Sequence, residues 1–520
     1  MTQICNLAQM LKVSAAQHEK RTALIYGQRK VSYRSLDEQS DNLSASLIGD
    51  LKIEKGQRVA LLLFNRPEFV ISYFGILKAG AVIVPVNTML KTDEIKYMLE
   101  DSGAIALITS PSFLYTAFEL RTRVESLRNI ILVSRKKTQE TIDFHSLLDK
   151  KPKNNRIGQI ARDDTAVIMY TSGTTGRLKG AELTHYNLVS NAKSSSCAIK
   201  ISVKDHFVCV LPLFHSFAAT VCMLLPIFCG SKVTIFVSPR PFKRILRTII
   251  RKRVTVFTGI PSMFNILKDA KLPRMLTAPL VSRIINPLRL CISGAAALPV
   301  DTLARFEKKF KVPLIEGYGL TEASPVVSLN PLKGMRKPGS IGLALPDVQV
   351  RVVDKTDKEV PIGEVGELLV KGPNVMKGYL NQPQANIETL KNGWLYTGDL
   401  AKLDADGYIY IVGRKKEMVN VRGLNVYPKE IEDALYEHPL VKEAAVIRIP
   451  DKHKGEVPKA FVVLKEESQV TSHKSQNDIE HELLSYLRER LASYKIPKYI
   501  EIRQFLPKNA TGKILKRNLQ

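Results

Sequence analysis

The stretch Thr171-Ser-Gly-Thr-Thr-Gly-Arg-Leu-Lys-Gly180 gathers four hydroxyl residues, three glycines and two cations in ten positions. It follows the apolar run Ala166–Tyr170, which is typical of a buried strand. A loop of this composition after a strand can direct backbone N–H groups and hydroxyls at phosphate oxygens, and Lys179 adds a mobile cation. The motif is not Walker A, because Gly180 follows the lysine. The sequence therefore predicts a different kind of phosphate-binding loop, and the alternative is an ordinary solvent-exposed turn.

The size and charge of the chain restrict the class of protein. A chain of 520 residues is too long for one compact core, so at least two domains are expected. The hydrophobic fraction of 45% and the charged fraction of 24% are typical of a globular protein. The net charge of +27 favours anionic partners, among them nucleotides, coenzymes, acidic proteins, nucleic acid and anionic membranes.

Cysteine usage and the N-terminus indicate the compartment. No CxxC spacing joins the six cysteines, which are Cys5, Cys197, Cys209, Cys222, Cys229 and Cys291. A disulfide framework or a zinc site is not expected, and a reducing compartment is. The first residues lack the apolar region of a signal peptide. We therefore expect a cytoplasmic protein.

The segment from 206 to 230 contains no Lys, Arg, Asp or Glu and is long enough to suggest a membrane span. Pro212, His215, Ser216 and Pro226 interrupt it. These residues favour a buried strand followed by a core helix, with a transmembrane helix as the alternative.

The order of apolar runs predicts the fold class. Short runs alternate with helical patterns, at 58–64, 81–86, 104–108, 129–133 and 233–237. This alternation is typical of parallel α/β layers. Closely spaced strands and Gly turns predict a β-rich subdomain over about 340–413, and a polar loop is expected near 466–478. We therefore predict an α/β N-terminal domain over 1–413 and a small, mobile α+β C-terminal domain over 414–520.

Tyr170–Gly180 resembles the phosphate loop of the adenylate-forming superfamily, which includes acyl-CoA synthetases, peptide-synthetase adenylation domains and beetle luciferases. Leu178 stands where the family usually has proline, and this replacement removes no hydrogen-bond donor to phosphate. Further stretches that resemble family motifs follow in the family's order, at 211–216, 293–297, 316–322, 396–399, 413–416 and 506–513.

The resemblance implies a nucleotide site for ATP and AMP. Its implied contacts are Thr171, Ser172, Gly173, Thr174, Thr175, Gly176, Lys179, Gly294, Ala295, Ala296, Glu316, Gly317, Tyr318, Gly319, Thr321, Asp399, Arg414 and Lys513. Asp399 can accept both ribose hydroxyls, as acids do in dinucleotide-binding folds. The alternative for Asp399 is a turn residue after Gly398. Arg414 is expected to hold the nucleotide from the other side.

The resemblance also implies the catalytic residues Lys513, His215, Thr321 and Glu322. Attack of a carboxylate on the α-phosphate builds up negative charge, and Lys513 is implied to bridge the two reactants and stabilise that charge. Glu322 is implied to bind Mg²⁺ through a hard oxygen. His215 is implied to line the acyl pocket. The alternatives are a solvated tail lysine, a helix-start glutamate and a satisfied core histidine.

A family member performs two half-reactions, and the resemblance implies a domain rotation between them. The hinge maps to Lys416, about which the C-terminal domain rotates before a thiol attacks. Arg422 and Gly423 are implied to line the path of coenzyme A, and Arg240 to meet its phosphates. ATP, Mg²⁺ and coenzyme A are therefore the expected cofactors.

The acyl substrate follows from two features. No acid occurs around His215–Met223, which disfavours an amino acid. The stretches 418–432 and 320–331 resemble bacterial long-chain fatty-acid–CoA ligases. The resemblance implies a fatty-acyl-CoA ligase that makes acyl-AMP and pyrophosphate and then acyl-CoA. Acyl carrier protein as the acceptor, and aryl or short-chain acids as substrates, remain alternatives.

The segment 239–289 contains twelve Lys or Arg and one acid, Asp269. Over 242–253, Ile and Leu recur at helical spacing with cations between them. This pattern indicates either a solvated helix face or a contact with an acidic carrier protein or with the inner face of an anionic membrane. Nucleic acid is not an expected partner, because no recognition motif accompanies the charge. A non-catalytic nucleotide sensor would lack Lys513 or Glu322, and both are present.

Overall fold

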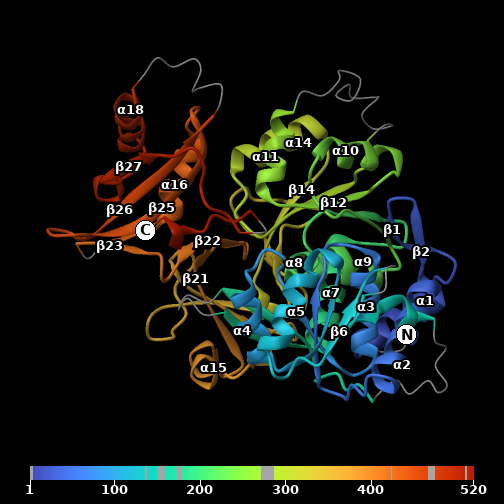
Figure 1. Ribbon diagram of the computed structural model, residues 1–520. Helices are drawn as coiled ribbons and strands as arrows, with labels where there is room; N and C mark the ends of the chain where they lie inside the picture. Colours follow the sequence, from blue (N-terminus) through green and yellow to red (C-terminus); the bar gives the residue numbers. More distant parts are fainter. Residues whose placement is uncertain are drawn as a thin grey trace.

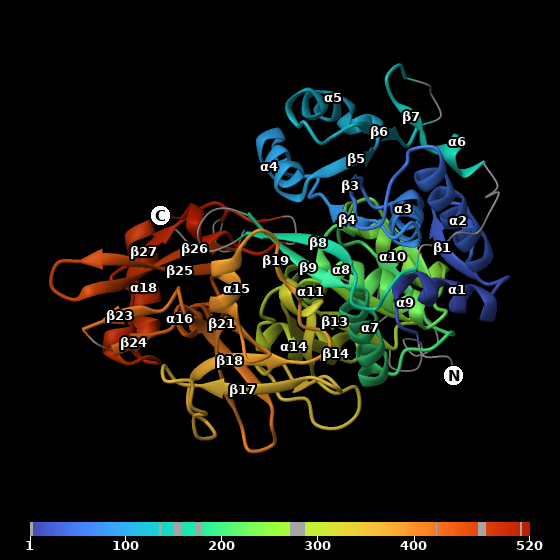
Figure 2. The ribbon, with the colours of Figure 1, turned by 90° about the horizontal axis from the view of Figure 1, so that it is seen from below.

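The structure is a computed structural model that describes residues 4–134, 138–149, 159–172, 178–270, 286–422, 424–465, 475–509 and 512–519. Four β-sheets organise these residues (Figure 1). Two large sheets belong to layers of helices and strands, a third sheet follows them along the chain, and a fourth forms the C-terminal part (Figure 2).

The first sheet has the strand order β19-β9-β8-β4-β3-β5-β6-β7. Strands β3 to β8 pair in parallel, and β9 and β19 are antiparallel. The strands are β3 (Arg58–Leu62), β4 (Val82–Pro85), β5 (Ala104–Thr109), β6 (Asn129–Leu132), β7 (Ile142–Asp143), β8 (Thr165–Ser172), β9 (Leu178–Thr184) and β19 (Gly378–Tyr379).

The second sheet has the order β16-β15-β14-β13-β12-β10-β11-β1-β2 and a parallel centre from β14 to β1. Its strands are β1 (Thr22–Tyr26), β2 (Arg29–Ser32), β10 (His206–Cys209), β11 (Lys232–Ile235), β12 (Val256–Gly259), β13 (Leu290–Ser293), β14 (Leu314–Gly319), β15 (Val326–Leu329) and β16 (Leu343–Ala344). The predicted parallel α/β layers are confirmed, and each of the five apolar runs is a strand.

Helices cover both sheets because each strand presents apolar side chains on two faces. One core joins α1 (Leu7–Gln17), α2 (Tyr33–Gly49), α3 (Pro67–Lys78), α7 (His185–Ile199) and α9 (Leu225–Phe228) between the two sheets. A second core places α4 (Thr92–Ser102) and α5 (Leu114–Arg123) on the outer face of the first sheet. A third places α10 (Phe242–Arg251), α11 (Pro261–Asp269) and α14 (Val300–Phe310) on the second sheet (Figure 1). The short helix α6 spans Phe144–Leu148.

The uncharged segment 206–230 forms β10 and then three short helical pieces, α8 (Ser216–Ala219), a π-helical turn (Thr220–Leu224) and α9. The predicted buried strand followed by a core helix is therefore correct. Within the described residues, no helix has the length and hydropathy that a membrane span requires.

The third sheet has the order β17-β18-β21-β20, with β22 beside β21. Its strands are β17 (Gln349–Val353), β18 (Gly366–Lys371), β20 (Leu390–Lys391), β21 (Trp394–Leu403) and β22 (Ile409–Arg414), and α15 (Pro383–Thr389) lies in the same part of the chain. The β-rich region is less separate than predicted, because β16 pairs with β15 of the second sheet and β19 pairs with β9 of the first.

The fourth sheet has the order β24-β23-β26-β25, with β27 beside β26. Its elements are β23 (Val419–Val421), β24 (Leu424–Val426), α16 (Pro428–Glu437), β25 (Val441–Asp451), β26 (Gly455–Leu464), α18 (Gln476–Arg488) and β27 (Tyr499–Ile502). The polar loop expected over 466–478 is shorter than predicted, since Ser475 and Asp478 cap the start of α18; residues 466–474 lie outside the described residues.

The chain passes from the third to the fourth sheet between Arg414 and Val419. The domain boundary expected after Gly413 stays a prediction. In Figure 2 the third sheet lies between the α/β layers and the fourth sheet.

Candidate active site

Parallel strands β10, β12, β13 and β14 end at one edge of the second sheet, and the loops that follow carry several of the predicted motifs. The segments 211–216 and 293–297 lie at the ends of β10 and β13. Ser216 and Thr321 hydroxyl oxygens are 3.1 Å apart and can share a hydrogen bond. The parallel topology thus brings the segments after β10, β13 and β14 to the carboxyl edge of the second sheet.

His215 begins α8 and caps it. Its Nδ1 accepts a hydrogen bond from the Phe217 backbone N–H at 3.3 Å. Burial and, to a smaller extent, the positive charge of Lys513 lower the pKa of His215 to about 4. Near neutral pH the imidazole is therefore uncharged, and the ring presents a weakly polar surface close to Lys513.

Lys513 reaches this edge from the C-terminal hairpin. The hairpin is held by pairing of Lys508 with Ile514 and by a hydrogen bond from the Lys513 backbone N–H to Asn509 Oδ1 at 2.9 Å. Gly512 has a φ of +76°, and a Cβ built on it would lie 2.7 Å from Ile260 Cδ1. The hairpin therefore lies directly against the loop between β12 and α11, where only glycine fits without displacing Ile260.

The charge of Lys513 is sensitive to its surroundings. Burial and the Arg414 cation lower the pKa of Lys513, Asp399 and Glu417 oppose the shift, and the resulting pKa is about 8. Arg414 and Asp399 belong to the third sheet, while His215, whose pKa is lowered by the charge of Lys513, follows β10 of the second sheet. The lysine is therefore a poorly solvated cation at the junction of several predicted site segments.

Asp399 and Arg414 face each other on β21 and β22. They pair across the two strands, and Arg414 Nε lies 3.2 Å from Asp399 Oδ1. The Tyr318 hydroxyl donates a hydrogen bond to the other carboxylate oxygen of Asp399 at 2.5 Å. Three residues predicted to contact the nucleotide thus form one connected cluster.

Glu322 lies in a short helical turn after β14 and accepts a hydrogen bond from the Tyr379 hydroxyl at 2.7 Å. The Lys179 ammonium lies 5.2 Å from the centre of the Tyr379 ring. Tyr379 was not predicted, because its position follows from the pairing of β19 with β9 rather than from a local motif. It connects the cation of the phosphate-loop motif to the predicted metal ligand.

Several predicted adenine contacts are explained in part by packing. The Glu316 carboxylate is buried and accepts a hydrogen bond from the Leu298 backbone N–H at 2.8 Å. A Cβ on Gly319 would lie 2.1 Å from the Pro325 carbonyl oxygen, and one on Gly294 would lie 2.7 Å from the Phe217 ring. These glycines are required by close packing whether or not a nucleotide binds.

The other predicted contacts of this group lie in β14 and in the loop after β13. A Cβ on Gly317 would lie 2.4 Å from Leu329 Cδ2, Ala295 has a φ of +69°, and Ala296 is exposed.

The structure does not bring every predicted residue to the cluster. Thr171 and Ser172 end β8, and residues 173–177, which include Gly173, Thr174, Thr175 and Gly176, lie outside the described residues, as does Gly423. Arg240 follows β11 and Arg422 lies between β23 and β24, and both are exposed. Among the described residues, no hydrogen bond or ion pair links either arginine to Lys513.

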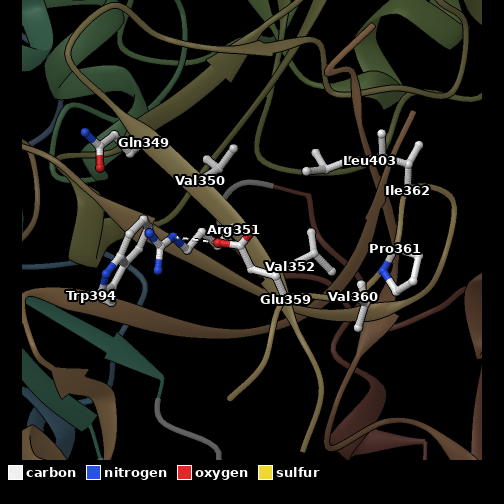
Figure 3. Close-up of a pocket in the computed structure, with 10 residues that line it drawn as sticks. All are labelled: Gln349, Val350, Arg351, Val352, Glu359, Val360, Pro361, Ile362, Trp394 and Leu403. Carbon is white, nitrogen blue, oxygen red and sulfur yellow. Dashed lines mark ion pairs between the residues drawn. The ribbon is translucent and has the colours of Figure 1, made fainter. Parts of the chain in front are cut away.

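A cavity of about 300 Å³ lies on the third sheet, and its lining includes no residue of this cluster (Figure 3). It is lined by Gln349, Val350, Arg351, Val352, Glu359, Val360, Pro361, Ile362, Trp394 and Leu403. None of these residues was predicted to contact a substrate, so the cavity is not the candidate active site.

The fold and the cluster define a class: a multilayered α/β protein whose site combines the carboxyl edge of a parallel sheet with a lysine from a C-terminal α+β part. The chain belongs to the AMP-binding enzyme family, whose model matches residues 11–380, while the model of the AMP-binding enzyme C-terminal domain matches 430–513. The predicted adenylate-forming superfamily is confirmed.

Relatives of known name cover nearly the whole chain. A long-chain-fatty-acid–CoA ligase of Escherichia coli O6:H1 is 35% identical over 99% of this chain and 94% of its own length. A feruloyl-CoA synthase of an Amycolatopsis species is 36% identical over 95% and 94%. The crystal structure of the anthranilate CoA ligase AuaEII in complex with anthranoyl-AMP has a TM-score of 0.88 and 30% identity over 99% of this chain and 96% of that one.

We predict that Glu316→Gln removes a loss of stability that the wild type suffers as the pH rises, so that the variant is the more stable protein at high pH. Burial raises the pKa of Glu316 to about 7, whereas an unfolded glutamate titrates near 4.5. Between these values the folded state holds a proton that the unfolded state has lost, so wild-type stability falls as the pH rises through this window. The variant should match the wild type near pH 5 and gain about 3 kcal/mol at pH 8.

Urea unfolding at several pH values measures this difference. The same substitution at exposed Glu364 is the control and should give a difference that does not change with pH. A stability difference at position 316 that stays constant from pH 5 to 8 would contradict the prediction.

Proposed function

We propose that this protein is a fatty-acyl-CoA ligase. It activates a fatty acid with ATP to acyl-AMP and pyrophosphate, and it then transfers the acyl group to coenzyme A. The observation that carries the proposal is the position of Lys513, which lies beside His215, Arg414 and Asp399. Membership of the AMP-binding enzyme family and the long-chain-fatty-acid–CoA ligase relatives support the same reaction.

In the first half-reaction the carboxylate attacks the α-phosphate and pyrophosphate leaves. Lys513 donates to the carboxylate and to the α-phosphate, which stabilises the charge that develops between them. Thr321 donates to the same phosphate. Asp399 accepts from the ribose hydroxyls while Arg414 holds it in place at 3.2 Å.

A magnesium ion would bind with the phosphates of ATP and neutralise part of their charge. Glu322 would hold it; one carboxylate is enough because Mg²⁺ keeps several water ligands and takes others from phosphate. This donor set fits the structure, in which no group of three or more His, Cys, Asp or Glu among the described residues could form a dedicated metal site. The Thr171–Gly180 loop and Lys179 would contact the other phosphates.

The acyl group is proposed to lie next to His215. The imidazole is uncharged at neutral pH, and Phe217, whose backbone N–H donates to it, belongs to the same apolar cluster as Ile260. The sequence His215–Met223 contains no acid that could pair with an amino group, which supports a fatty acid over an amino acid. Aryl acids remain the competing class, since relatives include a feruloyl-CoA synthase.

The second half-reaction requires Lys513 to leave. We propose that the C-terminal domain, residues 414–520, rotates about Lys416 relative to residues 1–413. Arg422 and Gly423 then line the path of the pantetheine thiol, and Arg240 meets the phosphates of coenzyme A. Acyl carrier protein is the alternative acceptor.

The basic segment 239–289 is proposed to hold the protein at the inner face of an anionic membrane, where fatty acid is dissolved. Helix α10 buries Ile245 and Ile249 and exposes its cations, as predicted. Burial lowers the pKa of Lys252, and the neighbouring cations Lys30, Arg251 and Lys232 lower it further. Such mutual repulsion between cations is relieved by a surface that carries negative charge.

The proposed reaction predicts fatty-acid-dependent exchange of labelled pyrophosphate into ATP in the presence of Mg²⁺. With a thiol acceptor added, AMP and a thioester should form. Parallel assays with ferulate, short-chain acids, and coenzyme A or acyl carrier protein identify the preferred substrates. Formation of ADP and phosphate would show that the reaction has been assigned wrongly.

We predict that Lys513→Ala lowers adenylation by about two to three orders of magnitude, as loss of other preorganised donors does. Thioester formation from supplied acyl-AMP should persist, because that step does not use the lysine. Because the pKa of Lys513 is about 8, wild-type kcat/KM for adenylation should fall as the pH rises above 8 and the cation is lost.

Lys513→Arg is the control for this pH dependence and should move the loss of activity to higher pH. An equal loss of both half-reactions in Lys513→Ala would contradict the division of roles.

The membrane proposal predicts binding to vesicles of phosphatidylglycerol and phosphatidylcholine but not of phosphatidylcholine alone. Replacing Lys243, Arg247 and Arg251 with serine should reduce flotation with the anionic vesicles by about tenfold or more. The same number of serine substitutions at exposed Lys333, Lys355 and Lys442 is the control. Equal flotation of the two triple variants would rule out α10 as the contact.

A further inference from the structure

The predicted hinge residue Lys416 lies in a tight turn. The Glu417 backbone N–H donates to the Arg414 carbonyl oxygen at 3.0 Å, and the Met418 N–H donates to the same oxygen at 3.1 Å. The residues on either side of Lys416 are attached to different parts of the structure: Lys415 to the third sheet and Glu417 to the C-terminal part.

Lys415, before the turn centre, is anchored to the third sheet. Its ammonium lies 2.7 Å from Glu367 Oε2, and its backbone N–H donates to the Gly398 carbonyl oxygen at 2.9 Å. Glu367 Oε1 accepts from the Gly398 N–H at 3.1 Å. The Glu367 side chain is only 11% exposed, whereas the Lys415 side chain is 55% exposed, so the carboxylate is fixed within the sheet and the lysine reaches it from the surface. Lys415 is thus held to the turn that carries Asp399.

Glu417, after the turn centre, is anchored to the C-terminal part. Its carboxylate lies 2.9 Å from the Lys516 ammonium, which also lies 2.8 Å from Glu432 on α16. Lys516 follows Lys513 by three residues. The residue after the hinge therefore moves with the segment that delivers the lysine to the site.

We propose that these two anchors confine the domain rotation to Lys416, and that Glu367 is a positioning residue that prevents Lys415 from sharing in the backbone change. The proposal rests on the proposed two-step function. Hinges generally spread a change in φ and ψ over a few residues. Here Lys416 is the one residue between the anchored residues Lys415 and Glu417. The C-terminal domain would then have two defined orientations, one for each half-reaction.

A suppressor experiment tests this inference. Proline at position 416 restricts φ near −65° and removes the backbone N–H, so Lys416→Pro should block the rotation. Acyl-AMP should form within about an order of magnitude of the wild-type rate while thioester formation falls about 100-fold or more. If Glu367 is what immobilises Lys415, adding Glu367→Gln should return rotational freedom to Lys415.

Glutamine at position 367 keeps an oxygen that can accept from Gly398 and removes only the charge that holds Lys415. The double variant should therefore recover thioester formation about tenfold relative to Lys416→Pro, a coupling typical of residues that share one network. Lys415→Met, which leaves the Glu367–Gly398 hydrogen bond intact, should suppress the proline to a similar extent. Recovery is partial because the Lys415 backbone hydrogen bond to Gly398 remains.

The matched control uses another ion pair of the same sheet. Arg351 Nε lies 2.8 Å from Glu359 Oε1 beside the cavity of Figure 3. Glu359→Gln, combined with Lys416→Pro, should give no recovery. Recovery there as well would mean that any loosening of the third sheet suffices and would overturn the role of Glu367.

The remaining outcomes distinguish a failure of this inference from a failure of the proposed two-step function. If Lys416→Pro separates the two half-reactions but neither Glu367→Gln nor Lys415→Met restores the second, the anchors do not confine the hinge and the inference is wrong, while the two-step function stands. If the folded Lys416→Pro variant forms thioester normally, the hinge itself is misplaced and the inference fails with it. Thermal unfolding of each variant verifies that the compared proteins are folded.

Discussion

The other parts of the site depend on one constraint, the stabilisation of the poorly solvated ammonium group of Lys513. A lysine surrounded by protein loses hydration, which lowers the pKa of Lys513 to about 8, and compensation by nearby acids limits this fall. Asp399 and Glu417 supply that compensation from opposite sides of the turn around Lys416. The charge of the lysine therefore depends on the relative position of the third sheet and the C-terminal part, and a rotation that withdraws it also restores its hydration.

Close packing around the second sheet fixes the positions of the loops that lie beside Lys513. Gly512 lets the hairpin approach Ile260, and Gly294 lets the Phe217 ring lie over the end of β13. The hydroxyls of Ser216 and Thr321 link the loops after β10 and β14. Small residues thus determine the distances between segments that are far apart in the sequence, while the polar side chains supply the chemistry.

Much of this arrangement could be predicted from the sequence. The alternation of apolar runs predicted the parallel layers, because strands buried on both faces read as continuous apolar segments. The proline and serine residues of 206–230 correctly argued against a membrane span. A shared site for His215, Thr321 and Lys513 was implied only by the family resemblance, because no local pattern records which loops meet in space.

The features that the sequence did not predict are tertiary ones. Tyr379 contacts Glu322 because a two-residue strand, β19, joins the edge of a sheet whose other strands come from residues 58–184. The same long-range pairing disperses the expected β-rich subdomain among three sheets. Periodicity is weak evidence for such short strands, since two residues cannot display an alternation.

The anchors around Lys416 are a second tertiary feature that the sequence alone does not predict. In the sequence Gly413-Arg-Lys-Lys-Glu417, the two lysines are chemically equivalent, and nothing local distinguishes Lys415 from Lys416, the proposed hinge. The distinction arises from Glu367, on a strand far away in the sequence, and from Lys516, near the C-terminus. A hinge is therefore defined by what holds its neighbours. Lys415 is held by a side-chain ion pair and by its backbone hydrogen bond to Gly398, and Glu417 by a side-chain ion pair, so the turn keeps its own backbone hydrogen bonds to Arg414.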